Sequence, residues 1–190
     1  MKNNAIPMLL ADFYKLSHRK MYKSGITKVY STWTPRQSLL KGIDYAVSFG
    51  QQMFIKQHLI SFFNEQFFNV PVDKIVSDYK RFVTATLGDP NPETQHIEDL
   101  HTLGYLPLTI KSIPEGIRVP IKVPILTIEN TDDRFFWLTN YIETLLSAEL
   151  WQTMTSATIA DSYKKILVKA AKETGGDLGF VEFQGHDFIS

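Results

Sequence analysis

The sequence predicts an α+β fold, in which helices are combined with a small antiparallel sheet. Apolar residues recur at helical spacing through two long stretches, residues 45–68 and 70–88. Residues 106–131 instead alternate apolar and polar side chains between proline-marked turns, which is typical of a strand meander. Helical spacing returns over residues 132–174. The meander is therefore flanked along the chain by helices, with a further strand expected at each end.

The first elements are a helix and a strand. Pro7 is a favourable first residue for a helix, and the apolar spacing that follows predicts a helix that continues to about residue 21, before Gly25. Residues 28–36 alternate in the period of a strand. Pro35 stops this strand, because proline cannot donate to a sheet, and leaves Arg36 just past its tip.

The middle of the chain is predicted to be helical. Residues 45–68 indicate one long helix or two, and residues 70–88 indicate another that ends at Gly88. Asn91 has the character of an N-cap, and the short helix after it should end at Gly104.

The meander and the last elements follow. Residues 114–116, Pro-Glu-Gly, predict a turn within the meander. Two helices are expected over about 132–151 and 155–174, and residues 179–183, GFVEF, predict a closing strand. The first of these helices has three candidate N-caps, which are Asn130, Thr131 and Asp132.

Composition excludes several classes of function. Lys and Arg number 20, as do Asp and Glu, so a net charge of zero gives no reason to expect nucleic acid or an anionic membrane as a partner. No stretch approaches the roughly 20 apolar residues of a membrane helix. The absence of cysteine excludes disulfides and thiolate chemistry and agrees with a cytoplasmic location. The five histidines show no metal-ligand spacing. We predict no metal ligand and no catalytic residue in this chain.

Four residues are candidates for binding. Asp12 and Tyr14 lie two positions apart near a helix start, so their side chains should point to different sides, and the simplest interpretation is a solvated Asp12 and a packed Tyr14. Arg36 either binds a phosphate or carboxylate or is a surface arginine. Phe188 either belongs to a core or offers its face to a flat heteroaromatic ring.

Several short motifs occur along the chain in a fixed order. They are D-x-Y-K from Asp12, PEG at 114–116, ENTD at 129–132, WLTNYIET at 137–144 and HDF at 186–188. In this combination the chain resembles the nicotinamide phosphoribosyltransferase family, the type II phosphoribosyltransferases of NAD salvage. The resemblance extends from about residue 7 to residue 188.

The resemblance implies a pentosyltransferase reaction. Nicotinamide attacks the anomeric carbon of phosphoribosyl pyrophosphate, and nicotinamide mononucleotide and pyrophosphate form. By the same resemblance, Tyr14 and Phe188 sandwich the nicotinamide ring, Asp12 lies at the same junction between subunits, and Arg36 contacts a phosphate. Tyr14 and Arg36 are expected to reach across a homodimer. Mg²⁺ and ATP are implied for the complete family enzyme, with no residue of this chain assigned to either.

The resemblance also implies a domain division. Residues 1–150 should form an N-terminal α+β domain, and residues 151–190 should begin an α/β barrel whose first strand is 179–183. Family members are more than twice this length, and Ile189 and Ser190 depart from the family pattern after HDF. We therefore expect a fragment, a frameshifted gene or one part of a split enzyme.

Two functions follow from this resemblance. The first is the N-terminal part of a nicotinamide phosphoribosyltransferase, inactive without the barrel that completes it. The second is a non-catalytic truncated homologue or split-enzyme subunit, which would act through the family dimer interface or by association with a separate C-terminal barrel.

Overall fold

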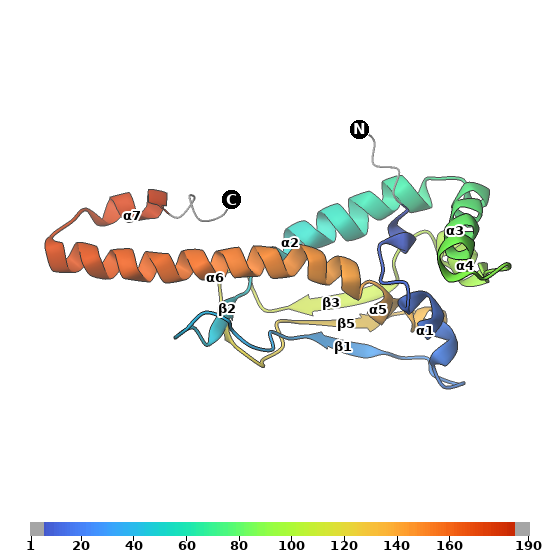
Figure 1. Cartoon of the computed structure of the whole chain (residues 1–190), viewed down its shortest axis with the longest axis horizontal. Helices are drawn as coiled ribbons and strands as arrows, with labels where there is room; N and C mark the ends of the chain where they lie inside the picture. The colour runs from blue at the N-terminus through green and yellow to red at the C-terminus, as the bar shows by residue number, and fades with distance from the viewer. Residues whose placement is uncertain (1–5, 185–190) are drawn as a thin grey trace. The chain divides into compact units, whose positions relative to one another are not determined.

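The computed structural model describes residues 6–184 (Figure 1). The chain divides into two compact units. Unit 1 contains the described part of Met1–Thr32, with Gln52–Lys111 and Thr127–Ser147. Unit 2 contains Trp33–Gln51, Ser112–Leu126 and the described part of Ala148–Ser190. Helices and two small sheets are both present, so the α+β class predicted from the sequence is confirmed.

Unit 1 begins with two short helices where one continuous helix was expected. A 3-10 helix, η1, spans Pro7–Leu9, and α1 spans Lys15–Met21. Between them the backbone leaves the helical path, and the amide of Asp12 donates to the side chain of Thr144 at 3.1 Å. The expectation of one helix was wrong because this tertiary hydrogen bond replaces a local one.

The helical part of unit 1 packs around phenylalanine rings. A helix that starts as α2 (Gln51–Phe54) continues through the π-helical stretches η2 (Ile55–Ser61) and η3 (Asn64–Phe68), and α3 (Val72–Leu87) and α4 (Gln95–Leu103) follow it. Fully buried side chains of these helices include Phe54, Phe63, Phe67, Ile75, Ile97 and Leu100. Rings of this size contribute a large share of the apolar area that stabilises a core.

Glycine ends two of these helices at the predicted positions. Gly88 follows α3 with φ +69°, and Gly104 follows α4 with φ +81°, a left-handed conformation that residues with a Cβ rarely adopt. The start of α4 differs from the prediction, because Thr94 rather than Asn91 precedes its first residue.

A three-stranded sheet lies almost wholly in unit 1. Its order is β1 (Tyr30–Trp33), β5 (Leu126–Asn130) and β3 (Leu108–Ser112), with β5 in the centre (Figure 1). Burial alternates along β5, so one face of the central strand packs inward. The predicted strand at 28–36 and the first and last strands of the predicted meander are confirmed. The meander itself was wrong, because the strand between them in sequence belongs to the second sheet.

The second sheet, in unit 2, pairs segments that the sequence did not connect. β2 (Tyr45–Val47) and β4 (Arg118–Pro120) are antiparallel, with Ala46 opposite Val119. The helix predicted from residue 45 was therefore wrong in its first residues. Three residues are too few for their periodicity to separate strand from helix, and the pairing partner lies more than 70 positions away.

Unit 2 has its own core. It includes Trp33, whose ring stacks on that of Trp151 with centroids 3.8 Å apart, and the apolar residues Val47, Val119, Ile125, Leu150 and Met154. The hydroxyl of Thr158 accepts from the backbone amide of Val47 at 2.9 Å. This bond joins the β2 strand to a helix.

The helical segment after the sheet is longer than expected. After η4 (Asp133–Phe135) and α5 (Leu138–Tyr141), one helix, α6, runs from Glu143 to Thr174 where two helices were predicted (Figure 1). Thr153 and Thr158 donate their hydroxyls to the carbonyls four residues earlier, at 2.9 and 2.6 Å. The threonines are thus accommodated inside the helix, and no glycine or proline interrupts it.

The closing strand predicted at 179–183 was also wrong. Leu178–Gln184 forms a helix, α7, and the carboxylate of Asp177 accepts from the amide of Gly179 at 2.8 Å at its start. A strand needs a neighbour to accept its backbone hydrogen bonds, and neither sheet of the described residues extends to this segment. The division at residue 150 and the barrel remain predictions.

Across residues 6–184 we find no helix with both the length and the apolar content required to cross a bilayer.

Replacing Gly50 by alanine should destabilise unit 2 by about 3 kcal/mol. Gly50 has φ +93°, and a Cβ there would lie 2.6 Å from Cγ2 of Thr153, so backbone strain and a steric clash add together. Gly42→Ala is the matched control, because Gly42 has φ +79° and no atom within 4 Å of the added Cβ. Urea unfolding should show a clearly smaller loss in the free energy of unfolding for Gly42→Ala than for Gly50→Ala. Equal losses for the two variants would show that the contact with Thr153 carries no cost.

Candidate functional site

Two of the predicted binding residues, Asp12 and Tyr14, belong to a cluster at the start of α1. We call the set Asp12, Tyr14, Lys15, Glu143 and Thr144 the α1 cluster; all five residues belong to unit 1. Lys15 is its centre, with only 4% of its side chain exposed. The Lys15 ammonium donates to Oε2 of Glu143 at 3.0 Å and to the Thr144 hydroxyl at 3.2 Å, and it lies 3.5 Å from Oδ2 of Asp12. A buried ammonium requires such partners.

The carboxylate of Asp12 is held in one orientation. The Thr144 hydroxyl donates to Oδ2 at 2.8 Å, while the amide of Asp12 donates back to the same hydroxyl. This hydrogen bond, followed by the charge and hydrogen bond of Lys15, lowers the pKa of Asp12 below its usual value. With 47% of its side chain exposed, Asp12 presents an ionised acceptor to solvent.

Tyr14 presents its ring outward. It occupies the N-cap position of α1 and is 57% exposed, so the packed interpretation of this residue was wrong. Its ring lies 5.0 Å from that of His18, tilted by 56°, and the Lys15 ammonium is 5.8 Å from its centroid. An exposed aromatic face beside an ionised carboxylate suits a flat ring that carries a hydrogen-bond donor.

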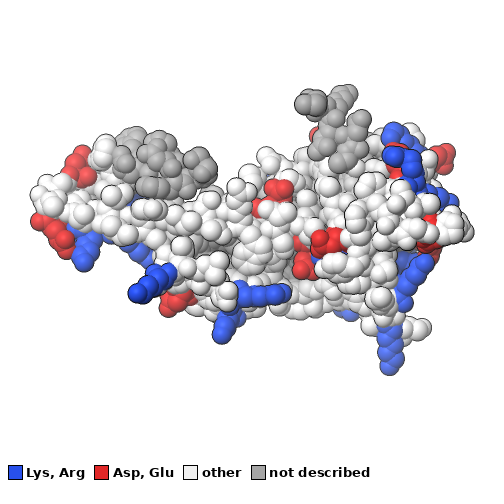
Figure 2. Space-filling view, in the orientation of Figure 1, with Lys and Arg blue, Asp and Glu red and all other residues white. Residues whose placement is uncertain are grey.

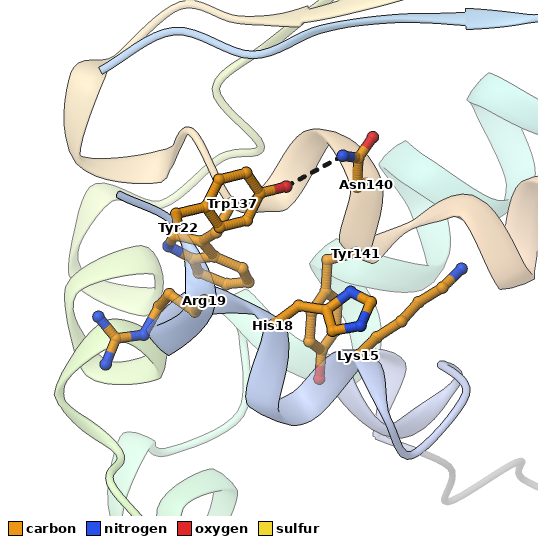
Figure 3. A pocket seen from close by; sticks show the side chains of 7 residues that line it. All are labelled: Lys15, His18, Arg19, Tyr22, Trp137, Asn140 and Tyr141. Atoms are coloured by element: carbon orange, nitrogen blue, oxygen red, sulfur yellow. Dashed lines mark hydrogen bonds between the residues drawn. The ribbon is translucent and has the colours of Figure 1, made fainter. Parts of the chain in front are cut away.

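A recess opens beside the α1 cluster, between α1 and the residues around α5 (Figure 3). The figure shows the amide of Asn140 bound to the hydroxyl of Tyr22, at 3.0 Å. The complete lining is Lys15, His18, Arg19, Tyr22, Trp137, Asn140 and Tyr141. The recess measures about 10 Å³, room for about one water molecule. It is too small for a pyridine ring.

The other two predicted residues, Arg36 and Phe188, are not assigned to this cluster. Arg36 is exposed, directly after the buried Pro35, and belongs to unit 2. Phe188 lies outside the described residues. Within unit 1, the structure brings together Asp12 and Tyr14.

The sequence did not single out Lys15, Glu143 or Thr144. Lys15 lies inside the D-x-Y-K motif, and Glu143 and Thr144 lie inside WLTNYIET. The motifs therefore contained these residues but did not indicate that their side chains are in contact. The contacts join residues 128 to 132 positions apart. Such pairs have no local periodicity from which they could be found.

Metal ligation finds no support in the part of the chain that the structure describes. No group of three or more His, Cys, Asp or Glu side chains there is arranged to hold an ion. We assign no residue of this chain to Mg²⁺.

Comparison with known proteins gives relatives by sequence, although no family model matches the chain. A nicotinamide phosphoribosyltransferase from Acinetobacter baylyi is 50% identical over 189 residues, which cover 97% of this chain and 37% of that protein. Over nearly its whole length the chain is homologous to nicotinamide phosphoribosyltransferases. Proteins of the same name from Mycoplasma genitalium (34% identical) and Xanthomonas campestris pv. campestris (31%) each match 95% of this chain.

The chain spans less than half the length of these nicotinamide phosphoribosyltransferases. It covers 43% of the Mycoplasma genitalium protein and 36% of the Xanthomonas protein. Among solved structures, human nicotinic acid phosphoribosyltransferase matches with a TM-score of 0.59 over 83% of this chain and 28% of that one. At 20% identity this match shows a shared fold.

Proposed function

We propose that this chain supplies part of the substrate site of a nicotinamide phosphoribosyltransferase. The reaction joins nicotinamide to the anomeric carbon of phosphoribosyl pyrophosphate, releasing pyrophosphate and giving nicotinamide mononucleotide for NAD synthesis. Support comes from 50% identity to a protein of that name over nearly the whole chain.

The observation that carries the proposal is the geometry of the α1 cluster. Tyr14 holds an exposed ring, and Asp12 beside it is an ionised carboxylate fixed by Thr144. Catalysis of this reaction requires a flat pyridine ring to be held in line with the anomeric carbon while positive charge develops on the sugar. Side chains that are fixed before the substrate arrives lose little entropy on binding it.

The proposed roles follow the chemistry of each side chain. Tyr14 and Phe188 stack on opposite faces of the nicotinamide ring, and Asp12 accepts hydrogen bonds at the same place. Arg36 contacts a phosphate of phosphoribosyl pyrophosphate, since a guanidinium forms forked hydrogen bonds to phosphate oxygens. Tyr14 and Arg36 act across a homodimer. Mg²⁺ would neutralise the charge of the leaving pyrophosphate, and ATP would be a further cofactor of the complete enzyme. The location proposed for the enzyme is the cytoplasm.

We expect the 190-residue chain alone to form no nicotinamide mononucleotide, because it covers 37% of its Acinetobacter relative. Mixing it with a separately produced remainder of that relative should restore formation of the mononucleotide. In the mixture, Tyr14→Ala should raise KM for nicotinamide about 3- to 10-fold, the value of one aromatic stack. Mononucleotide formation is followed by chromatography.

Two variants serve as controls. Tyr14→Phe keeps the ring face and should keep KM, and Tyr105→Ala removes a ring of similar exposure, 54%, elsewhere in unit 1. Turnover by the chain alone would refute the first expectation. A mixture that binds without turnover would favour the non-catalytic subunit, and an equal effect of both alanine variants would refute the role of Tyr14.

A further inference from the structure

A groove in unit 2 is lined mainly by basic side chains. It has a volume of about 560 Å³ and lies between Arg118 of β4 and the second half of α6. The residues of α6 that line it are Asp161, Lys164, Lys165, Val168, Lys169, Lys172 and Glu173. Five cations thus face two carboxylates in a chain whose net charge is zero. Figure 2 shows blue basic side chains below α6, with red acidic ones among them.

One wall of the groove is ordered by a network of hydrogen bonds. Arg118 donates from Nε and Nη2 to the two carboxylate oxygens of Asp161, at 2.8 and 2.6 Å. Lys165 donates to the Tyr45 hydroxyl at 2.7 Å, and that hydroxyl donates to Asp161 at 2.8 Å. Arg118 has five N–H groups, so three remain for a ligand. The network fixes two cations of the groove before any ligand binds.

Two further cations of the groove, Lys169 and Lys172, have few partners of their own. Lys169 is 78% exposed, and its distance of 3.9 Å to Glu173 makes that ion pair weak. The ammonium of Lys172 forms no hydrogen bond or ion pair among the side chains described between residues 6 and 181. Positions 165, 169 and 172 share one face of α6, because residues three and four apart are neighbours on a helix. The three lysine positions therefore form a row about 10 Å long along the helix axis.

We propose that this α6 lysine groove binds a small polyphosphate anion. A single phosphate cannot reach both ends of a row of this length, whereas a chain of phosphoryl groups can contact successive cations. The volume falls in the range of small-molecule pockets, which favours a compact ligand over a nucleic acid. No residue that the proposed function uses lines the groove, so this inference goes beyond that function.

The test is isothermal titration of the 190-residue chain with inorganic tripolyphosphate. We expect one ligand per chain, with an affinity that falls as sodium chloride is raised. Lys169→Gln/Lys172→Gln should weaken binding at least about tenfold, since two charged hydrogen bonds are lost. Lys56→Gln/Lys80→Gln removes the same charge from exposed positions of unit 1 and should leave the affinity within about twofold.

Circular dichroism confirms that each variant is folded before titration. Absence of tripolyphosphate binding overturns the proposal, as does an equal loss of affinity in the two double variants. Orthophosphate that binds as tightly as tripolyphosphate overturns the assignment to an extended anion. None of these outcomes depends on nicotinamide binding or turnover, so the groove and the proposed function fail separately.

Discussion

Replacing Asn130 by alanine is expected to lower the free energy of unfolding by about 3 kcal/mol. The Asn130 side chain is 1% exposed and hydrogen-bonds three backbone groups. Its oxygen accepts from the amide of Val29 at 2.8 Å, and its nitrogen donates to the carbonyls of Thr27 and Asp132, at 2.8 and 3.0 Å. Alanine leaves all three groups without these partners in a partly buried place, and urea unfolding measures the loss.

Asn140→Ala is the matched control for this prediction. The Asn140 side chain forms two hydrogen bonds, but its partners are the side-chain hydroxyls of Ser31 and Tyr22, which can turn to solvent. Its loss should cost about 1 kcal/mol. If Asn140→Ala lowers the free energy of unfolding as much as Asn130→Ala, the backbone hydrogen bonds of Asn130 contribute no more to stability than the side-chain hydrogen bonds of Asn140.

Acidification should destabilise unit 1 through His96. Burial, followed by the nearby positive charge of Arg19, lowers the pKa of His96 to about 4 from 6.5, while Glu93 and Asp99 oppose this shift. The unfolded chain therefore takes up a proton near pH 6.5, and the folded chain only near pH 4. The free energy of unfolding should fall by up to about 3 kcal/mol as the pH falls between these values.

Nuclear magnetic resonance and unfolding curves check this prediction together. The imidazole of His96 should stay neutral in the folded chain at pH 5, and His96→Gln should flatten the dependence of stability on pH between 6.5 and 4. A His96 that titrates near pH 6.5 in the folded chain would contradict it.

Much of the fold could be predicted where local chemistry decides it. Gly88 and Gly104 end helices because the left-handed conformation at their positions favours glycine. Asp132, one of three candidate caps, does cap η4, and it accepts from the amide of Arg134 at 3.0 Å. The errors lie where tertiary contacts decide, as in the pairing of β2 with β4 and in the break before α1.

In the candidate site, too, local features could be predicted from the sequence and tertiary contacts could not. The motif around Asp12 and Tyr14 pointed to the correct place, but the residues alone favoured a packed Tyr14, and the structure exposes it. Lys15 was missed because a lysine is expected on a surface, and its burial depends on Glu143 and Thr144, which the chain supplies about 130 positions later.

The three tryptophans give the molecule internal fluorophores. Trp33 and Trp151 form a stacked indole pair in unit 2, whereas Trp137 is the sole indole of unit 1 and meets the imidazole of His96 edge to face at 5.1 Å. Emission from a chain that retains only Trp137 would therefore follow one unit without interference from the other, and proton uptake by the adjoining imidazole would be visible as quenching of that signal.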